Sequence, residues 1–247
     1  MALLRLDKLL SQSGDLSRAE AGKLIRAGLV SVDGDCVKNP SGKADAEQSV
    51  VLLRGRRIGY TPYQYLMVNK PAGMVTAARD RSSDTVMRLV PQSMQARDVM
   101  PVGRLDKDTT GLLLFTNNGT LAHRLLSPKR HVWKEYLVTV DGLLTMADIT
   151  AFASGVMLQD FTAKPAELTI LSASAAESQA VVRLREGKFH QVKRMFAARD
   201  LQVTALHRQS FGPLTLDIPC GRTRTLQTNE IQALYNAAQM DWEGQHG

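Results

Sequence analysis

The sequence predicts an α+β protein in which a small N-terminal module precedes a larger domain built on a mixed, largely antiparallel sheet with flanking helices. Three observations predict this class. The chain has 247 residues, which is enough for two domains. Residues 1–58 contain helix and hairpin signals of their own. Beyond them, strand-like and helical runs follow one another without the regular spacing of βαβ units.

Two helices and a hairpin are predicted in the N-terminal module. Arg5–Ser13 has leucines at helical spacing. Ser17, with Glu20 three residues later, predicts a capping box at the start of a second helix. A following Asp-Gly pair predicts a tight hairpin. The strands predicted around and after that hairpin are Leu29–Val32, Asp35–Lys38 and Gln48–Leu53.

The second predicted helix has two unlike faces. At ~100° per residue, one face is basic and the other is apolar. The basic residues are Arg18, Lys23 and Arg26, and the apolar ones are Ala21, Leu24 and Ile25. The basic face is either a contact surface for phosphates or an ordinary solvated face, and the spacing favours neither interpretation.

A basic, glycine-containing stretch, Arg54–Thr61, separates the two parts of the chain, and we place the linker at 59–64. The larger domain is predicted at 65–240, followed by a polar, flexible tail at 241–247. Its predicted strands are Tyr65–Val68, Leu112–Thr116, Glu135–Val140, Ala166–Leu171 and Ala180–Leu184. Its predicted helices are Leu121–Leu126, Met146–Ser154, His190–Arg199 and Glu230–Ala238.

The composition favours a polyanionic partner. There are 31 basic and 24 acidic residues, giving a net charge of +7. Such a surface suits nucleic acid or an acidic membrane, and a merely basic soluble protein is the alternative. No stretch is apolar for long enough to span a membrane, and no signal peptide is apparent at the first residues. The two lone cysteines, Cys36 and Cys220, are typical of a reducing compartment. We therefore expect a cytoplasmic protein without a membrane partner, and a monomer by default.

Motifs for cofactors are missing from the sequence. It contains no glycine-rich phosphate loop or dinucleotide fingerprint, and its five histidines lack the spacing of metal ligands. Motifs of serine and cysteine nucleophiles are missing as well. We expect neither a cofactor nor a metal ion.

The segment Gly103–Gly111 is the densest candidate for chemistry. Two glycines bracket a polar loop that leads into an apolar strand, where scaffolds often position reactive groups. Asp106 lies there near Arg104 and Lys107, whose charges would keep a carboxylate ionised for nucleophilic or base catalysis. The alternative, which the pattern alone favours, is a turn whose Asp and Thr side chains bond their own backbone.

Two further clusters combine basic and aromatic residues, at 183–194 and at 129–136. Basic groups near a helix start suit phosphate contact, and an aromatic side chain among cations suits base stacking. The alternative for both is a basic surface over an ordinary sheet.

Three segments resemble the signatures of ribosomal pseudouridine synthases. They are Gly103–Thr116, Lys134–Val138 and Glu186–Met195, in the family's order. The chain is most similar to the small-subunit pseudouridine synthase A group, whose pattern also fits Asn69–Gly73 and Leu206–Arg208. The N-terminal module resembles an S4 RNA-binding domain, through Arg5–Lys8 and Ser17–Ala19 to Val32–Gly34. The resemblance covers nearly the whole chain.

The resemblance implies roles for the matching residues. Asp106 corresponds to the essential aspartate, Tyr136 to the tyrosine that stacks on the target base, and Lys193 to the basic residue that pairs with the aspartate. Arg104 is expected to contact RNA or brace the flipped nucleotide. The further expected RNA contacts are Lys107, Lys134, Lys188, His190, Gln191, Arg194 and Arg208, together with Arg18, Lys23 and Arg26. One departure is Asn118, where an acid is common.

The implied activity is the isomerisation of one uridine to pseudouridine in ribosomal RNA, most simply the small-subunit (16S) RNA. The N1–C1′ bond breaks, the base rotates and a C5–C1′ bond forms, without a cofactor. The uridine must leave its stack, so the RNA must be gripped around it. The aspartate either attacks C1′ or removes the C2′ proton, and the residues do not distinguish these routes. The alternatives are a large-subunit RNA target and a non-catalytic S4-type RNA-binding or ribosome-assembly protein.

Overall fold

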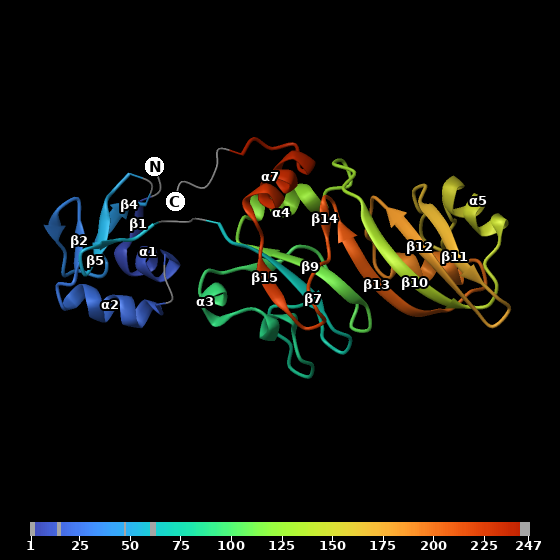
Figure 1. Ribbon diagram of the computed structural model, residues 1–247, viewed down its shortest axis with the longest axis horizontal. Coiled ribbons are helices and arrows are strands. Elements are labelled where there is room, and N and C mark those ends of the chain that lie inside the picture. The colour runs from blue at the N-terminus through green and yellow to red at the C-terminus, as the bar shows by residue number, and fades with distance from the viewer. Residues whose placement is uncertain (1–2, 14–15, 47, 60–62, 243–247) are drawn as a thin grey trace. The chain divides into compact units, whose positions relative to one another are not determined.

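Two helices and two small sheets form the N-terminal part of the chain (Figure 1). The computed structural model describes residues 3–13, 16–46, 48–59 and 63–242. The helices are α1 (Leu6–Ser13) and α2 (Arg18–Arg26). A two-stranded sheet joins β1 (Leu3–Arg5) to β4 (Lys43–Asp45). A second sheet has the order β3-β2-β5-β6, with β2 at Val30–Val32, β3 at Asp35–Cys36, β5 at Val51–Leu53 and β6 at Arg56–Arg57.

The capping box predicted for the second helix is confirmed. The backbone N–H of Glu20 donates to the Ser17 hydroxyl at 3.3 Å, and the Ser17 N–H donates to the Glu20 carboxylate at 2.8 Å. These two bonds satisfy donors that the first turn of a helix leaves free. The helix then packs its apolar face into a core of buried leucine, valine, isoleucine and alanine side chains from α1, α2 and the small sheets.

The two faces of α2 are arranged as predicted. Ala21 and Ile25 are fully buried, whereas Arg18, Lys23 and Arg26 are exposed. The basic face of α2, meaning these three exposed residues, is therefore open to a polyanionic partner.

The basic stretch Arg54–Thr61 contains the short strand β6, which pairs with β5, and the linker placed at 59–64 begins after that strand. The basic residues at 56 and 57 thus belong to the N-terminal sheet. Residues 60–62 of the predicted linker and residues 243–247 of the predicted tail lie outside the described residues. The chain divides into two compact units, with Met1–Gln64 and Pro91–Val99 in the first and Tyr65–Val90 and Met100–Trp242 in the second. The segment Pro91–Val99 contains the one-turn helix α3 (Gln92–Gln95).

Nine strands of the second unit form one sheet with the order β11-β12-β10-β13-β9-β7-β15, to which β14 adds beside β13 and β8 beside β9. The strands are β7 (Tyr65–Lys70), β8 (Met100–Pro101), β9 (Thr110–Thr116), β10 (Lys134–Asp141), β11 (Glu167–Ala173), β12 (Glu177–Leu184), β13 (Val203–Phe211), β14 (Leu214–Thr215) and β15 (Thr223–Thr225). The helices are η1 (Val86–Leu89), α4 (Gly119–Leu126), α5 (Met146–Ser154), α6 (Gln191–Ala197) and α7 (Thr228–Ala237). The sheet is mixed and largely antiparallel, as predicted.

The centre of this sheet is the parallel contact between β9 and β13, where Gly111 faces Arg208. Gly111 has a φ of 104°, and a Cβ atom there would lie 2.2 Å from the Arg208 carbonyl oxygen. Only glycine allows the two strands to approach so closely. This contact joins the β7–β9 half of the sheet to the β10–β12 half, directly after the loop that carries Asp106.

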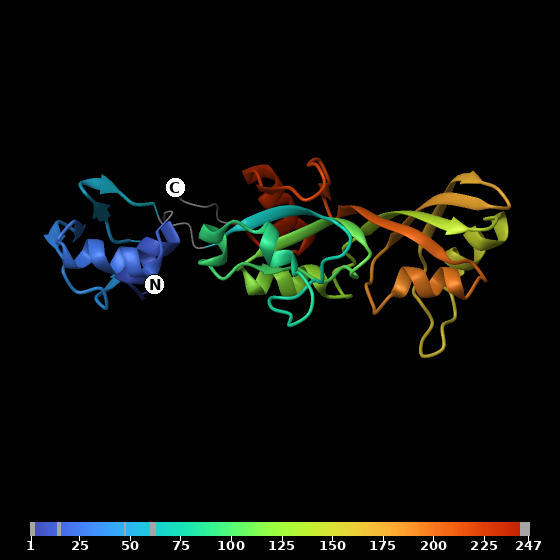
Figure 2. The ribbon, with the colours of Figure 1, turned by 90° about the horizontal axis from the view of Figure 1, so that it is seen from below.

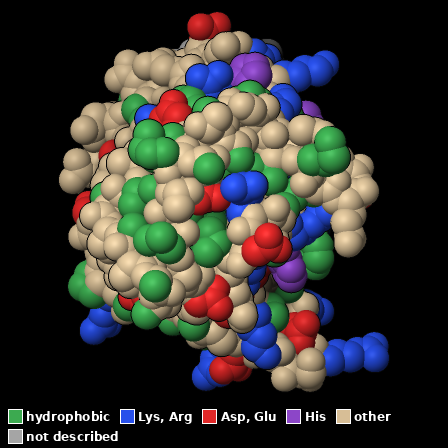
Figure 3. All heavy atoms as spheres, turned by 90° about the vertical axis from the view of Figure 1, so that its right-hand side faces the viewer, with side chains coloured by type: hydrophobic (Ala, Val, Ile, Leu, Met, Phe, Trp, Pro, Cys, Tyr) green, Lys and Arg blue, Asp and Glu red, His purple; other side chains and the backbone are tan. Residues whose placement is uncertain are grey.

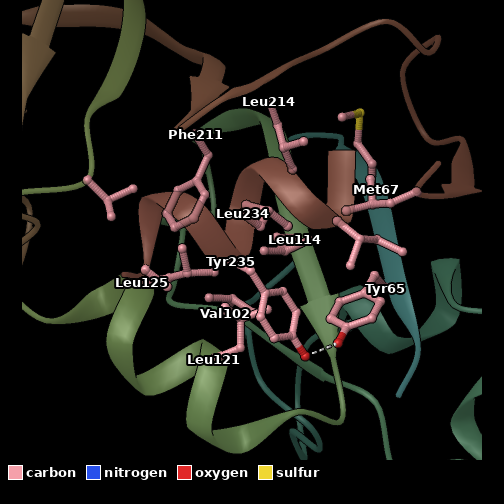
Figure 4. Packing of buried hydrophobic residues seen from close by; sticks show 14 of the residues in the cluster. Tyr65, Met67, Val102, Leu114, Leu121, Leu125, Phe211, Leu214, Leu234 and Tyr235 are labelled. Carbon is pink, nitrogen blue, oxygen red and sulfur yellow. Dashed lines mark hydrogen bonds between the residues drawn. The ribbon is translucent and has the colours of Figure 1, made fainter. Parts of the chain in front are cut away.

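Two regions of packing flank that contact. In the first, α4 and α7 cover strands β7 and β9 with the apolar cluster shown in Figure 4. In the second, α6 lies against the half of the sheet formed by β10, β12 and β13 (Figure 2). The rings of Phe152 from α5 and Phe196 from α6 meet at 4.9 Å between centroids.

Asn118, which departs from the resemblance, has a structural role in the first region. Its side-chain oxygen accepts from the Leu121 N–H at 3.0 Å and caps α4, while its side-chain NH₂ donates to the Tyr235 hydroxyl at 2.8 Å. The Tyr65 and Tyr235 hydroxyls lie 2.9 Å apart (Figure 4). An ionised Asp could accept the first bond but could not donate the second.

The sequence missed β13 although it predicted the other long strands and the longer helices. The run Val203–Phe211 contains His207, Arg208 and Gln209, so it lacks both an apolar run and a clean alternation. Two of its polar side chains form hydrogen bonds inside the unit: Arg208 Nε donates to the Leu112 carbonyl at 2.7 Å, and the Gln209 side-chain NH₂ donates to the Glu135 carboxylate at 2.7 Å. None of the helices in the described ranges is long and apolar enough to cross a membrane.

Candidate active site

The loop that carries Asp106 connects β8 to β9 and is held by buried hydrogen bonds. The Thr76 hydroxyl donates to the Leu105 carbonyl at 2.7 Å, and the Leu105 N–H donates back to it at 3.1 Å. One residue later, the turn closes with the Thr109 N–H donating to the Asp106 carbonyl at 3.1 Å. These bonds fix the backbone on both sides of Asp106 and leave its carboxyl group free to face the pocket.

Lys70 holds the same loop through hydrogen bonds, although the sequence analysis assigned it no role. Its side chain has no exposed surface, and its ammonium donates to the carbonyls of Pro71, Lys107 and Thr109 at 3.0, 3.2 and 2.7 Å. Burial lowers the pKa of Lys70 to about 8, while the carboxylates of Asp108 and Asp106 oppose that change. Three carbonyls match the three protons of the charged form. The sequence did contain a signal for this buried cation, because Lys70 follows closely on the apolar residues of the predicted strand Tyr65–Val68.

The Asp106 carboxylate lies between two basic side chains. One of its oxygens is 3.4 Å from His190 Nε2, and the other is 3.8 Å from Lys193 Nζ. Its side chain is 27% exposed, so the carboxylate is reachable yet partly shielded from water. Lys193 is the basic partner that the resemblance implied for Asp106, whereas Lys107, which the sequence pattern placed beside it, donates to the Ser83 hydroxyl at 3.3 Å.

Lys193 has a second and closer partner. Its ammonium donates to both carboxylate oxygens of Asp108, at 2.6 and 2.7 Å. This hydrogen bond holds the pKa of Asp108 below its usual range. The ammonium of Lys193 therefore lies between two carboxylates, that of Asp106, as expected, and that of Asp108. The sequence missed this role of Asp108, although its position two residues after Asp106 was a signal.

The turn before α6 places His190 and Lys193 beside the loop. The buried Glu186 carboxylate accepts from the Lys164 N–H at 2.7 Å and from the Gln191 side chain at 2.6 Å, and the Gln191 side-chain oxygen accepts from the Lys188 N–H at 2.9 Å. His190 takes a left-handed backbone conformation, with a φ of 48°, at the start of the helix. The Gln191 side chain thus holds the turn through buried hydrogen bonds, and the residue also lines the pocket, so its contact with RNA stays a prediction.

One pocket unites the three residues predicted as catalytic. Asp106, Tyr136 and Lys193 all line it. Its apolar wall consists of Tyr136, Leu184, Val192 and Leu206, while Arg104, Lys188 and His190 add polar groups. The strands β10, β12 and β13 and the first turn of α6 supply the wall, and the Asp106 loop and the segment from Lys188 to Lys193 supply the charged groups. An apolar wall beside a cationic rim can accept a flat, uncharged base together with its sugar-phosphate chain.

The predicted RNA contacts near the pocket divide into exposed and buried groups. Arg104, Lys107 and Lys188 are exposed, and Arg104 and Lys188 line the pocket. The Lys188 ammonium lies 3.3 Å from the centroid of the Phe161 ring, and Arg194 pairs with Asp160. These positions remain consistent with contact to RNA.

The prediction that Lys134 and Arg208 contact RNA is not supported by their positions. Both side chains are buried, and neither lines the pocket. The Lys134 ammonium donates to the Val132 carbonyl at 2.9 Å, and both side chains lie near the Phe211 ring. Burial and the charge of Arg208 lower the pKa of Lys134 to about 8, with Glu186 opposing them. The sequence shows the charge of these residues but not their burial.

Replacing Lys134 by Met is expected to leave RNA affinity unchanged and to flatten the pH dependence of stability. Between pH about 8 and 10.5 the unfolded chain keeps the Lys134 proton while the folded chain loses it, so the free energy of unfolding rises with pH in the wild type. The Met variant lacks this contribution. Urea unfolding at about pH 7 and about pH 9.5 measures the difference. Lys188→Met, at an exposed position, is the control: it should weaken RNA binding and keep the slope. A loss of RNA affinity in Lys134→Met would contradict the buried role.

The surface at the β11 end of the second unit has no concentrated basic patch on the face shown in Figure 3. On the face shown in Figure 3, at the end of the sheet formed by β11, basic side chains are scattered among acidic and hydrophobic ones. No cluster of three His, Cys, Asp or Glu side chains among the described residues is placed to hold a metal ion.

Comparisons with known proteins match both parts of the chain. The family model described as RNA pseudouridylate synthase matches residues 64–198, and that of the S4 domain matches residues 4–50. An uncharacterised RNA pseudouridine synthase of Bacillus subtilis is 38% identical over 94% of this chain and 98% of its own length. The ribosomal small subunit pseudouridine synthase A of Escherichia coli is 40% identical over 94% of this chain and all of its own length. A crystal structure of a pseudouridylate synthase aligns with a TM-score of 0.65 at 36% identity, covering 94% of this chain and 99% of the other.

Proposed function

Because the chain belongs to the RNA pseudouridylate synthase family, we propose that it isomerises one uridine of small-subunit ribosomal RNA to pseudouridine, with Asp106 as the catalytic carboxylate. The observation that carries the proposal is the pocket itself. A partly shielded carboxylate stands within 4 Å of His190 and Lys193, beside the ring of Tyr136. Relatives similar over nearly their full length are named for the small ribosomal subunit, which supports the choice of RNA.

The residues of the pocket fit the steps of the isomerisation. The flipped uracil would lie against Tyr136, and its ribose would meet Asp106. In one route the carboxylate bonds to C1′ as the N1–C1′ bond breaks, and it is released again when C5 of the turned base bonds to C1′. In the other route it takes the C2′ proton as the N1–C1′ bond breaks, and it returns that proton to C2′ when C5 bonds to C1′. The C5 proton is lost and N1 is protonated, so the product is an isomer of the substrate. Lys193 would stabilise the charge on Asp106 as it changes during these steps.

The N-terminal unit supplies a second grip on the RNA. It carries the S4 match and exposes Arg18, Lys23 and Arg26 on one face of α2. We propose that residues 1–58 dock ribosomal RNA through this basic face, while residues 65–240 hold the target uridine. Two separate contacts would offset the cost of unstacking the nucleotide, which is about a few kcal/mol.

The chain would act as a monomer in the cytoplasm. The pocket is lined by residues of one chain, so a second copy is not needed to complete it. Both cysteines are exposed and free, which suits a reducing compartment. Sedimentation at several concentrations tests the first statement: a single species at the monomer mass supports it.

The test of the proposed function uses the purified full-length chain with three substrates: naked small-subunit RNA, naked large-subunit RNA and assembling small subunits. Pseudouridine is then mapped at single-nucleotide resolution. We expect one converted uridine in small-subunit RNA. Conversion of large-subunit RNA alone would overturn the choice of substrate. Tight RNA binding without conversion in any of the three would indicate a non-catalytic binder.

Replacing Lys193 by Met is expected to lower kcat by about 10²-fold, because the carboxylates lose their shared cation. RNA affinity should change little, since the ammonium is engaged by Asp108 rather than exposed to phosphate. Single-turnover rates and filter binding separate the two quantities. Asp108→Asn is the matched control, because it removes a carboxylate from the same cluster and retains Lys193 beside Asp106. An equal fall of kcat and affinity in Lys193→Met would indicate phosphate binding instead.

A further inference from the structure

Phe189 is the most unusual side chain at the rim of the pocket. It is 76% exposed, although it lies between two residues that line the pocket, Lys188 and His190. Its ring stacks on the His190 ring, with centroids 3.8 Å apart and planes inclined by only 18°. The stacked pair thus has one end against the pocket and a large aromatic surface toward solvent.

The turn that carries the pair is held by buried hydrogen bonds. His190 begins α6 in a left-handed conformation, and its Nε2 atom lies 3.4 Å from the Asp106 carboxylate. The turn that precedes it is held by the buried Glu186 and Gln191 side chains. The exposed ring of Phe189 therefore stacks on the residue whose Nε2 atom reaches the catalytic carboxylate.

The surroundings of Phe189 favour a nucleotide over an apolar protein surface. Lys188 is exposed next to it in the chain, and Arg104, which is also exposed, lines the same pocket. An exposed aromatic ring bordered by cations matches a base with its phosphates, because the base stacks while the cations meet the backbone. A protein partner would instead favour a continuous apolar patch.

We propose that Phe189 stacks on an unpaired base that directly neighbours the target uridine in the RNA strand. This inference rests on the proposed function and assigns to the site a second nucleotide position, outside the pocket that takes the uridine. The Phe189–His190 pair would then hold the strand beside the flipped nucleotide and keep its ribose over Asp106.

The test uses an RNA hairpin that spans the mapped uridine, with Phe189→Leu and Phe189→Tyr as a matched pair of variants. Leu keeps an apolar side chain but removes the aromatic ring, whereas Tyr keeps the ring. Loss of one stacked base corresponds to roughly 5- to 150-fold in affinity, so we expect KM to rise by about 10-fold or more in Phe189→Leu and to stay near the wild-type value in Phe189→Tyr. An unfolded variant is recognised by thermal melting.

A substrate without the neighbouring base isolates the stacking contact. With an abasic site directly 5′ or directly 3′ of the uridine, one of the two RNAs should bind wild type and Phe189→Leu equally well. 2-Aminopurine at that position should be quenched by the wild type and less so by Phe189→Leu. The proposal is overturned if Phe189→Leu has the wild-type KM on intact RNA. It is also overturned if the affinity defect of Phe189→Leu persists on both abasic RNAs, or if that defect appears only with assembling particles. Absence of conversion by the wild type would overturn the proposed function itself.

Discussion

Replacing Asp106 by Asn is expected to abolish pseudouridine formation while the protein still folds and binds RNA. The amide has nearly the same shape but can neither attack C1′ as a carboxylate nor accept a proton. Loss of a catalytic carboxylate of this kind lowers turnover on the order of 10⁴-fold or more. The loop should keep its structure, because its buried bonds come from Thr76 and Lys70 and do not involve the Asp106 side chain. Single-turnover conversion of the mapped RNA gives the rate, and a gel shift gives the affinity.

Asp108→Asn is the control for Asp106→Asn, since it also removes one negative charge from the partners of Lys193. The exposed Asp108 is 71% accessible and does not line the pocket. We expect this variant to keep most of its turnover. Equal loss in the two variants would show that the charge of the cluster matters and not the chemistry of Asp106. Wild-type turnover in Asp106→Asn would show that another group performs the reaction.

Gly111→Ala is expected to destabilise the second unit strongly. A Cβ atom at this position would lie 2.2 Å from the carbonyl oxygen and 2.7 Å from the nitrogen of Arg208, and backbone atoms cannot move aside as a flexible side chain can. The positive φ adds a conformational cost. Together these effects should lower the free energy of unfolding by roughly 3–5 kcal/mol. At this size, that is a fall of about 10 °C in Tm.

Gly221→Ala separates the two contributions. Gly221 also has a positive φ, of 75°, but nothing lies within 4 Å of the position its Cβ would take. We expect only the conformational cost there, about 1 kcal/mol. Calorimetric scans of both variants measure the difference. A similar fall in Tm for both would mean that the close approach of β9 and β13 has no special importance.

Local signals in the sequence predicted the elements that depend on local interactions. The capping box of Ser17 and Glu20 forms within four residues, so the sequence alone contains the whole interaction. The helix Met146–Ser154 likewise has the predicted bounds. Strand β13 was missed because its pairing with β9 joins residues about a hundred positions apart, and because the charged side chain of Arg208 is buried by that same non-local packing.

The candidate site was predictable only in part, for a similar reason. The resemblance placed Asp106, Tyr136 and Lys193 in one site, and all three line one pocket. A motif does not show whether the ammonium of Lys193 lies closer to Asp106 or to Asp108, because those distances depend on the path of the loop between β8 and β9. Nor does a motif distinguish an exposed lysine from a buried one within a strand, which is why Lys134 was assigned to RNA.

The most direct test maps pseudouridine in the ribosomal RNA of cells that lack this protein and then express either the wild type or Asp106→Asn. We predict that one uridine of the small-subunit RNA is unmodified without the protein, is converted when the wild type is restored, and stays unmodified with Asp106→Asn. Full conversion of that uridine by the Asp106→Asn variant, or an unchanged pseudouridine map in cells without the protein, would contradict the account.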